Sequence, residues 1–329
     1  MSKMEERLNQ HMAKSVEEKA KELREHKTNR EYATHIRNQA EIERANTLDV
    51  TRVPENFYTE LENQHDAMAD SFKNRLPFIT AQLTEFVPLY YPNLILVGAL
   101  SGSGKTTVAA NAIFRFYKNG FKTLLISNEE LTIDVYNRIA CLELGLNINK
   151  RELFTPEENS KIKSLHKTIG DSLRVIDIRY EDNPNLTSSV EGVEAILNSA
   201  FKNSGSFDCI IVDYYQKISI SKNDPTKAKH LVLSELTNLL DRYYKLVKAP
   251  IIVLCQLHPT KKGETDSFES RIKEGKSIIT ACTYAIELKA DKDMESTEWI
   301  CRKGRFGNQG RQRETIWRNG KFFDRGGSQ

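Results

Sequence analysis

The sequence lacks any run of eighteen consecutive apolar residues, so none of its segments could cross a membrane as a helix. It also lacks an apolar stretch near its start, where charged residues begin at Lys3, and this argues against a signal peptide. None of the five cysteines stands in a Cys-x-x-Cys pair, so a zinc site or redox dithiol is not expected. Cys209 and Cys255 lie inside apolar runs and are expected to be buried and reduced, as in a cytoplasmic protein.

Glycine and proline are also absent from residues 1–46, which are rich in Glu, Lys, Arg, Gln and Ala and therefore predict a helix with a thin apolar stripe. A second helical stretch is predicted from Glu60 to about Phe86, interrupted near Pro77. We expect residues 1–85 to form a helical N-terminal extension for oligomerisation or partner docking, and residues 86–329 to form the core. A solvated arm that recruits another protein is the alternative interpretation of the first segment.

From residue 93 onward, short apolar runs alternate with helical segments. Continuous apolar runs separated by helices predict a mostly parallel, twisted sheet that is buried on both faces and flanked by helices, an α/β fold. A hairpin turn is predicted at Asn319-Gly320. The runs expected to form strands are 93–97, 122–126, 173–177, 208–212, 250–254, 284–288, 298–301, 315–317 and 321–323.

A loop rich in glycine and serine stands between the first of these runs and a helical segment that begins near Thr107. Its Gly-Lys-Thr end, in this strand–loop–helix context, is typical of the P-loop, in which backbone N–H groups hold phosphates. Lys105 is expected to neutralise the β- and γ-phosphates of ATP, and Thr106 to offer its hydroxyl to Mg²⁺. Ala99 occupies the first position of the motif, where the strict pattern has glycine. The residues expected to hold the nucleotide are Ala99, Ser101, Gly102, Ser103, Gly104, Lys105, Thr106 and Thr107.

Three later strand ends are predicted to complete an ATPase site. Asp213 ends an apolar run and is expected to hold Mg²⁺, through a water. Glu129 or Glu130 follows the run 122–126 and could orient the attacking water. A helix N-cap at Ser127, with Glu130 at its third position, is the alternative explanation for this acidic segment. Gln256 ends a further run, where a neutral amide could sense the γ-phosphate.

Taken together, these segments resemble the DnaB-type (superfamily 4) replicative helicases and their RecA-like relatives over roughly residues 86–323. Residues 211–216, Ile-Val-Asp-Tyr-Tyr-Gln, are close to that family's Asp-Tyr-Leu-Gln signature. Residues 126–131 are similar to the segment with the catalytic glutamate, which corresponds to Glu129, and residues 253–258 to the sensor strand with Gln256.

The same resemblance extends to residues 301–307, Cys-Arg-Lys-Gly-Arg-Phe-Gly. This run is similar to the Lys-x-Arg segment that reaches the ATP site of the neighbouring subunit, with Lys303 and Arg305 at the matching positions. Its Lys-x-Arg-Phe-Gly form is also like that of the RadA recombination ATPases. An arginine supplied in this way neutralises transition-state charge and makes hydrolysis depend on assembly. A basic surface turn is the alternative.

The resemblance implies a RecA-like P-loop NTPase core that uses ATP and Mg²⁺. It further implies a homo-oligomeric, hexameric ring that translocates on single-stranded DNA during replication, as a DNA-dependent ATPase and helicase. A helicase loader or another replication protein would be its partner, in the cytoplasm of a bacterial cell or a phage-infected host. A RecA/RadA-like recombination or strand-annealing ATPase remains the main alternative, and an ATP-driven switch acting on proteins is a third.

Two lysine-containing loops follow the strands that end near Asp213 and Gln256. The family usually carries Asp-Leu-Arg-x-Ser-Gly in the second loop, where this chain reads Ser-Arg-Ile-Lys-Glu-Gly-Lys-Ser over residues 270–277. Cations there would bind the phosphates of a single strand without reading its sequence, and solvated surface lysines are the alternative. The residues expected to contact nucleic acid are Lys217, Lys222, Lys261, Lys262, Arg271, Lys273 and Lys276.

Overall fold

The computed structural model describes residues 56, 58–63, 65–66, 75–89, 93–178, 188–202, 207–218, 226–247, 249–260, 267–272, 275–291, 293, 295–305 and 307–325. The helix predicted over residues 1–46 lies outside these residues. The chain divides into two compact units, residues 1–66 and 67–329. This division precedes the predicted boundary at 85/86, because residues 76–89 already belong to the core of the second unit.

The predicted helix from Glu60 to Phe86 is only partly observed. Residues 60–63 are helical, residues 75–80 are not, and helix α3 spans Ala81–Phe86. Leu76 pairs with Leu89 in an isolated antiparallel bridge, and Leu83 of α3 is fully buried. Burial of this segment against the core therefore replaces one continuous helix with a short strand contact and a short helix.

The described strands form one nine-stranded sheet in the order β3-β2-β4-β5-β1-β6-β7-β8-β9. Neighbours from β3 to β6 pair in parallel, and β7, β8 and β9 continue the sheet in antiparallel fashion. Each predicted run overlaps one strand, which confirms the α/β fold with a mostly parallel sheet. The strands are β1 (Leu94–Leu100), β2 (Thr123–Ser127), β3 (Leu173–Asp177), β4 (Cys209–Asp213), β5 (Ile251–Leu257), β6 (Tyr284–Ala290), β7 (Ser296–Gly304), β8 (Gln312–Arg318) and β9 (Lys321–Asp324).

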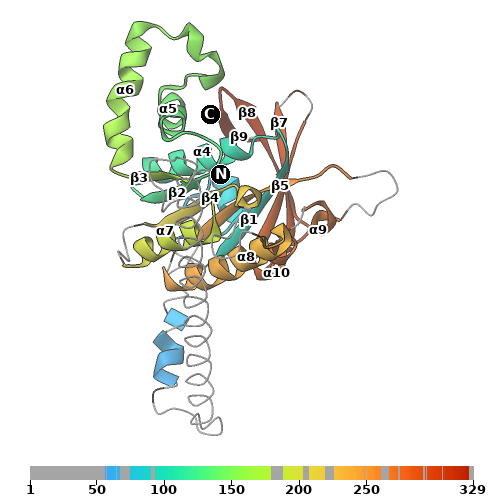
Figure 1. Cartoon of the computed structure of the whole chain (residues 1–329). Coiled ribbons are helices and arrows are strands. Elements are labelled where there is room, and N and C mark those ends of the chain that lie inside the picture. The colour runs from blue at the N-terminus through green and yellow to red at the C-terminus, as the bar shows by residue number, and fades with distance from the viewer. Residues whose placement is uncertain are drawn as a thin grey trace, which may run out of the picture. The chain divides into compact units, whose positions relative to one another are not determined.

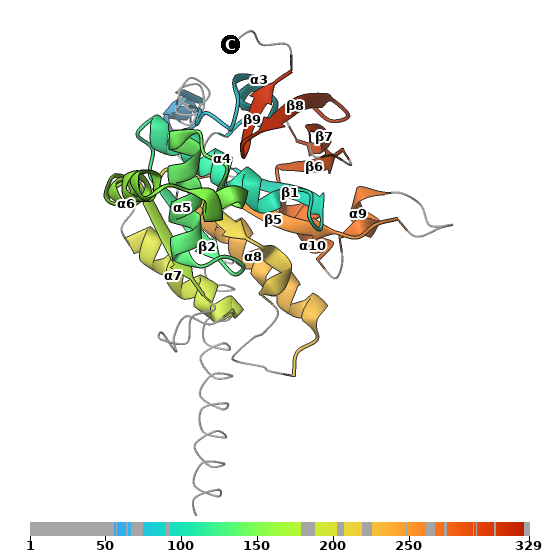
Figure 2. The ribbon, with the colours of Figure 1, turned by 90° about the horizontal axis from the view of Figure 1, so that it is seen from above.

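Helices cover both faces of the sheet (Figures 1 and 2). Helices α4, α5 and α6 contribute buried side chains to one core cluster, and α7, α8, α9 and α10 to the other. A parallel sheet needs this double cover because its strands are apolar on both sides. The helices are α4 (Lys105–Lys118), α5 (Thr132–Leu144), α6 (Pro156–Gly170), α7 (Val190–Lys202), α8 (Lys229–Leu246), α9 (Phe268–Arg271) and α10 (Ser277–Ala281), with 3₁₀ segments at Ile148–Leu153 and Tyr215–Lys217.

The hairpin between β8 and β9 forms at the predicted turn. Asn319 and Gly320 both have positive φ, 48° and 82°, which is the conformation that favours Asn-Gly in a two-residue hairpin loop. The turn lies against α4, because Asn111 of that helix donates a hydrogen bond from Nδ2 to the Gly320 carbonyl at 2.7 Å. This contact places the hairpin beside the helix that follows the glycine-rich loop.

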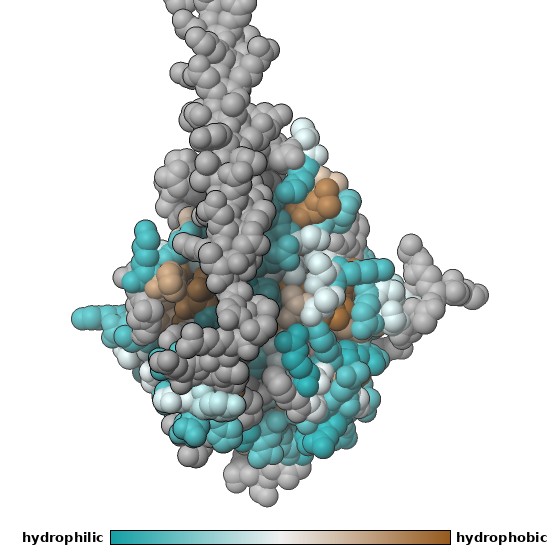
Figure 3. Space-filling model, turned by 90° about the horizontal axis from the view of Figure 1, so that it is seen from below, coloured by the Kyte–Doolittle hydropathy of each residue, from teal (hydrophilic) through white to brown (hydrophobic). Residues whose placement is uncertain are grey.

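The surface on the side of α7 and α8 is mostly hydrophilic, with a few separate apolar patches (Figure 3). Phe201, Leu231 and Leu246 are exposed large apolar residues of these helices. Apolar side chains that stand singly are normal on a protein surface and do not mark a site. Within the described residues, no helix combines the length and the apolar character that a membrane span requires.

Candidate nucleotide site

The glycine-rich loop connects β1 to α4 and has the backbone shape of a phosphate cradle. Gly102 and Gly104 have φ values of 77° and 86°, a region that residues with a Cβ rarely adopt. The Ser103 N–H bonds the Leu100 carbonyl at 3.2 Å, which closes the loop, and Gly104 is the N-cap of α4. The N-terminal N–H groups of α4 are therefore directed at the position an anion would take.

The predicted loop residues differ in how they can act. Lys105 is 8% exposed, and its Nζ donates to the Leu100 carbonyl at 3.3 Å across the loop. Ser101 is exposed, and Thr106 is partly buried at the start of α4. Ala99 lies inside β1 with its side chain fully buried, so it shapes the strand and does not present a side chain to a ligand.

Two acidic groups lie close to this lysine, as the sequence predicts. Leu125 of β2 and Ile211 of β4 belong to the core cluster shared with α4, so the period of two along β4 puts Asp213 on the same face. The carboxylates of Glu129 and Asp213 both raise the pKa of Lys105, although burial lowers it by more. The structure thus brings together the cation and the two carboxylates that the sequence proposes for ATP hydrolysis.

Asp213 is a buried carboxylate with an unused oxygen. Its side chain is 2% exposed, and its Oδ1 has no hydrogen-bond partner among the described residues. Burial, reinforced by the charges of Glu129 and Glu130, raises the pKa of Asp213 to about 7, against the opposing effect of Lys105 and Lys217. A buried carboxylate oxygen without a hydrogen bond is costly, so Oδ1 of Asp213 is suited to accept a ligand. Carboxylate and hydroxyl oxygens suit Mg²⁺, so Asp213 and Thr106 fit the predicted metal role.

This raised pKa predicts how stability depends on pH. Asp213 keeps its proton in the folded protein up to about pH 7 but loses it near pH 3.8 in the unfolded chain. The unfolded state therefore binds fewer protons between these values, and nucleotide-free protein should lose stability as the pH rises through this window. We expect Asp213→Asn to remove that loss of stability. At pH 8 the free energy of unfolding of the variant should exceed that of the wild type by up to about 4 kcal/mol. Urea unfolding of both proteins at pH 5 and 8, without magnesium, tests this; parallel pH profiles would contradict it.

Glu130 has a structural partner that Glu129 lacks. Its Oε1 lies 2.5 Å from Nη2 of Arg138 on α5, and both side chains are partly exposed. The Ser127 hydroxyl accepts a hydrogen bond from the Glu130 N–H at 3.2 Å, but α5 begins later, with Leu131 as its N-cap. Ser127 therefore caps a turn before the helix. Glu129 remains 39% exposed, with one oxygen 3.8 Å from Nζ of Lys217.

The three residues after Asp213 each contact a different neighbouring part of the protein. The Tyr214 ring has Lys105 at 5.9 Å and Lys217 at 5.2 Å from its centroid. Tyr215 is buried, and its hydroxyl donates to the Leu233 carbonyl of α8 at 2.6 Å. The Gln216 side chain accepts from the Gln256 N–H at 3.0 Å and donates to the Gln256 carbonyl at 2.8 Å. Gln216 thus fixes the backbone of the predicted sensor residue to the end of β4.

The basic turn after β7 is built around glycines. A Cβ at Gly304 would lie 1.9 Å from the Gly307 carbonyl oxygen, so only glycine fits there. The Arg305 side chain is exposed, and the Arg305 backbone N–H donates to the Thr283 carbonyl at 3.0 Å. The Lys303 side chain does not extend away from its own subunit, as its predicted role at the neighbouring subunit's ATP site would require. Its Nζ donates to the carbonyls of Ile279 at 2.5 Å and Thr280 at 3.0 Å, at the end of α10.

Two of the predicted nucleic-acid contacts have other partners here. Arg271 is 8% exposed and pairs with Glu287, because it belongs to α9 and packs on the sheet instead of entering a loop. Lys217 lies at the nucleotide site beside Glu129. Lys276 is exposed at the start of α10, as a phosphate contact requires. Lys222, Lys261, Lys262 and Lys273 lie outside the described residues.

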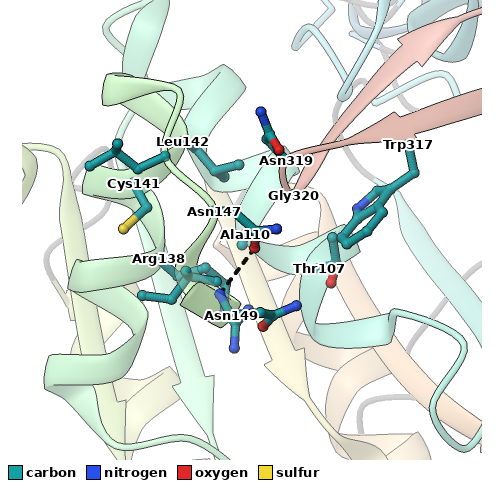
Figure 4. Close-up of a pocket in the computed structure, with 12 residues that line it drawn as sticks. Thr107, Ala110, Arg138, Cys141, Leu142, Asn147, Asn149, Trp317, Asn319 and Gly320 are labelled. Carbon is teal, nitrogen blue, oxygen red and sulfur yellow. Dashed lines mark hydrogen bonds between the residues drawn. The ribbon is translucent and has the colours of Figure 1, made fainter. Parts of the chain in front are cut away.

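A pocket that the sequence did not predict opens beside the loop, between α4, α5 and the β8–β9 hairpin. Thr107 and Trp317 lie on one side of it and Arg138 on the other (Figure 4). The indole Nε1 of Trp317 is buried without a partner among the described residues. A flat aromatic ring and a cation next to a phosphate cradle can hold a heterocyclic base. The sequence signal was a tryptophan two residues before an Asn-Gly turn, but its partners come from distant segments.

Comparisons with known proteins agree with this geometry. The family model for the DnaB-like helicase C terminal domain matches residues 86–319. A solved structure described as an ATPase domain is similar over 83% of this chain and 99% of its own, with a TM-score of 0.67 and 16% identity. A DnaB-like replicative helicase, described with its interactions with primase, is similar over 87% of this chain and 70% of its own, with a TM-score of 0.64 and 18% identity. A structure of the RadB recombinase is similar over 76% of this chain and 99% of its own, with a TM-score of 0.51 and 16% identity.

At these identities, the structural likenesses show the fold alone, and that fold is the RecA-like one expected from the sequence. Among proteins of curated function, none matches the chain by sequence comparison.

Proposed function

The chain belongs to the DnaB-like helicase C-terminal domain family, and from this premise we propose that it is an ATP-dependent DNA helicase. It would form a hexameric ring and translocate on single-stranded DNA during replication, fuelled by ATP with Mg²⁺. The observation that carries the ATPase part is the cluster of Lys105, Glu129 and Asp213, whose Oδ1 has no hydrogen-bond partner in the described part of the chain. A helicase loader or another replication protein would be its partner.

Each residue of the cluster has a distinct task in this proposal. The loop N–H groups and Lys105 would bind the β- and γ-phosphates, and Thr106 and Asp213 would hold the metal, Asp213 through a water. A magnesium ion bound there would neutralise charge on the phosphate oxygens. Glu129 orients the attacking water, since Glu130 is engaged by Arg138. The Gln256 side chain would contact the γ-phosphate. The Gln216 side chain bonds the Gln256 backbone, so a shift of Gln256 would also move the end of β4.

The Trp317 pocket completes the nucleotide site. It lies against Thr107 at the start of α4, so a nucleotide with its phosphates in the loop could place its base between Trp317 and Arg138. Arg305 and Lys303 would act on the ATP of the neighbouring subunit, and Lys303 would first have to leave the α10 carbonyls that it bonds. Lys222, Lys261, Lys262, Lys273 and Lys276 would contact the single strand through its phosphates.

A second function has two observations in its favour. The structural likeness to the RadB recombinase covers most of the chain, and the Lys-x-Arg-Phe-Gly turn is also like that of recombination ATPases. Such a protein would bind and remodel single strands with the same ATPase core. It would not displace a strand processively.

A forked duplex distinguishes these functions. We expect the wild-type protein to hydrolyse ATP faster with single-stranded DNA and to release one strand of a fork in an ATP-dependent reaction. Lys105→Ala should abolish both activities, because it removes the buried cation of the phosphate loop. DNA-stimulated hydrolysis without strand release would favour the recombination function. A rate of ATP hydrolysis that does not change when DNA is added would contradict both the helicase and the recombination function.

A further inference from the structure

Glu287 on β6 is a fully buried carboxylate outside the nucleotide site. Its side chain is 0% exposed, and both oxygens accept hydrogen bonds from arginines. Arg271 Nη1 donates to Oε1 at 2.5 Å, and Arg302 Nε donates to Oε2 at 2.6 Å. A buried charge is tolerated only when it has partners of opposite charge. Removing one member of the cluster leaves the charge of its partner buried without compensation. Glu287 therefore fixes α9, which carries Arg271, relative to β7, which carries Arg302.

Helix α9 reaches Glu287 because β1 offers a flat surface next to it. Gly98 of β1 pairs in register with Glu287, and a Cβ at Gly98 would lie 3.0 Å from the ring of Phe268. The missing side chain lets Phe268, the first residue of α9, lie directly on the strand that leads into the phosphate loop. Arg271, one helical turn later, is then placed over Glu287.

The same arginine is tied to the end of the sensor strand. Arg271 Nε donates to the His258 carbonyl at 3.0 Å, and the His258 N–H bonds the Arg271 carbonyl at 2.8 Å. Leu257 and Ile272 form an antiparallel bridge beside these bonds. Gln256 stands next to Leu257 on β5. These contacts hold α9 against the end of β5.

On the other side, Arg302 belongs to the strand that presents the basic turn. The register between β6 and β7 shifts between Ala285 and Ile286, which leaves Arg302 as an extra residue in β7. A bulge of this kind redirects side chains. Arg302 reaches Glu287, and the following Lys303 reaches the α10 carbonyls. Arg305 comes two residues after Lys303, and its backbone N–H donates to the Thr283 carbonyl.

We propose that Glu287 is a positioning residue for Arg305. It connects the end of β5, which faces a subunit's own ATP, to the turn that offers Arg305 to the next subunit's ATP. The inference rests on the proposed in-trans role of Arg305, which the proposed function includes. It requires only the described residues of β5, α9, β6 and β7.

The first test is kinetic. Glu287→Gln keeps the shape of the side chain but removes the charge that holds both arginines. We expect the kcat for ATP hydrolysis to fall by about 10- to 100-fold, because misplacement of an acting group by about 1 Å can cost that much. The KM for ATP should stay within about twofold, since the loop, Thr107 and Trp317 are untouched. Glu194→Gln, which breaks the exposed pair with Arg242 between α7 and α8, is the control and should change neither value. An unchanged kcat in folded Glu287→Gln would overturn the proposal.

The second test separates positioning in trans from a general loss of structure. A Lys105→Ala subunit cannot use its own ATP but still offers an intact Arg305, whereas a Glu287→Gln subunit has the converse defect. Mixed oligomers of the two should hydrolyse ATP at least several-fold faster than either alone. Arg305→Ala mixed with Lys105→Ala is the positive control, and Glu129→Gln with Lys105→Ala, both defective at their own site, should show no gain. Recovery with Arg305→Ala but not with Glu287→Gln would overturn the proposal.

If Glu287→Gln does not fold, substitutions of Arg302, the partly exposed partner of Glu287, test the same proposal. Arg302→Lys keeps the charge at Glu287, and Arg302→Met removes it from a side chain that is 33% exposed. We expect Arg302→Met to lose kcat as above and to recover in the mixture, with Arg302→Lys closer to the wild type. Wild-type kcat in Arg302→Met would overturn the proposal. Because only ATP turnover is measured, these results stand apart from the forked-duplex outcome, which tests the helicase function itself.

Discussion

Replacing Glu129 with glutamine is expected to slow ATP hydrolysis by about 10²- to 10⁴-fold while ATP still binds. The amide has the shape of the carboxylate but cannot draw a proton from the attacking water. Lys105, the glycines of the loop and the Trp317 pocket, which would bind the nucleotide, are unchanged in this variant. Phosphate release measures the rate, and equilibrium binding of a fluorescent ATP analogue measures affinity.

Glu130→Gln is the matched control one residue away. It removes the ion pair with Arg138, which is partly exposed on both sides, so we expect a loss of roughly tenfold at most. A large loss in Glu130→Gln together with near-normal turnover in Glu129→Gln would move the water-orienting role to Glu130. Full turnover in both variants would remove this acidic segment from the chemistry.

The elements that the sequence predicted well are those set by local patterns. Continuous apolar runs marked the inner strands β1, β2, β4 and β5, because strands covered on both faces have no polar side to interrupt the run. Asn319-Gly320 fixed the last hairpin through its positive φ angles, and the glycines of the phosphate loop did the same for Gly102 and Gly104. The grouping of Asp213 with Lys105 followed from strand ends that meet at one edge of a parallel sheet.

The features that the sequence did not predict depend on partners far away in the chain. Arg271 was expected to face nucleic acid, but its environment is set by Glu287 on another element and by the bare backbone of Gly98. Lys217 was assigned to a loop, and its position beside Glu129 depends on how two strand ends meet. The pocket at Trp317 needs α5 and the last hairpin together. Charge and polarity in the sequence reveal that such side chains are present, but tertiary packing decides which ligand they face.

Replacing Arg305 with alanine is expected to lower the rate of ATP hydrolysis by about 10³- to 10⁵-fold, without loss of ATP binding. Arg305 is the exposed cation of the turn, whereas Lys303 is bonded to its own subunit through the carbonyls of Ile279 and Thr280. The tight fit of Gly304 against the Gly307 carbonyl and the bond to Thr283 hold the Arg305 backbone in place. A held backbone with an exposed guanidinium is suited to act on another subunit, where it would stabilise charge on the transferred phosphate.

Because Arg305 acts between subunits in this view, its effect should depend on assembly. The wild-type rate per subunit is expected to rise with protein concentration as oligomers form, whereas the Arg305→Ala rate should stay low at every concentration even though light scattering shows the same assembly. Arg311→Ala is the matched control, since Arg311 is an exposed arginine of the same β7–β8 connection, bonded to Asn308, and its loss should change little. A wild-type rate that is independent of concentration down to the monomer, or an Arg305→Ala variant with normal turnover, would show that the arginine is a surface residue and that each subunit hydrolyses ATP alone.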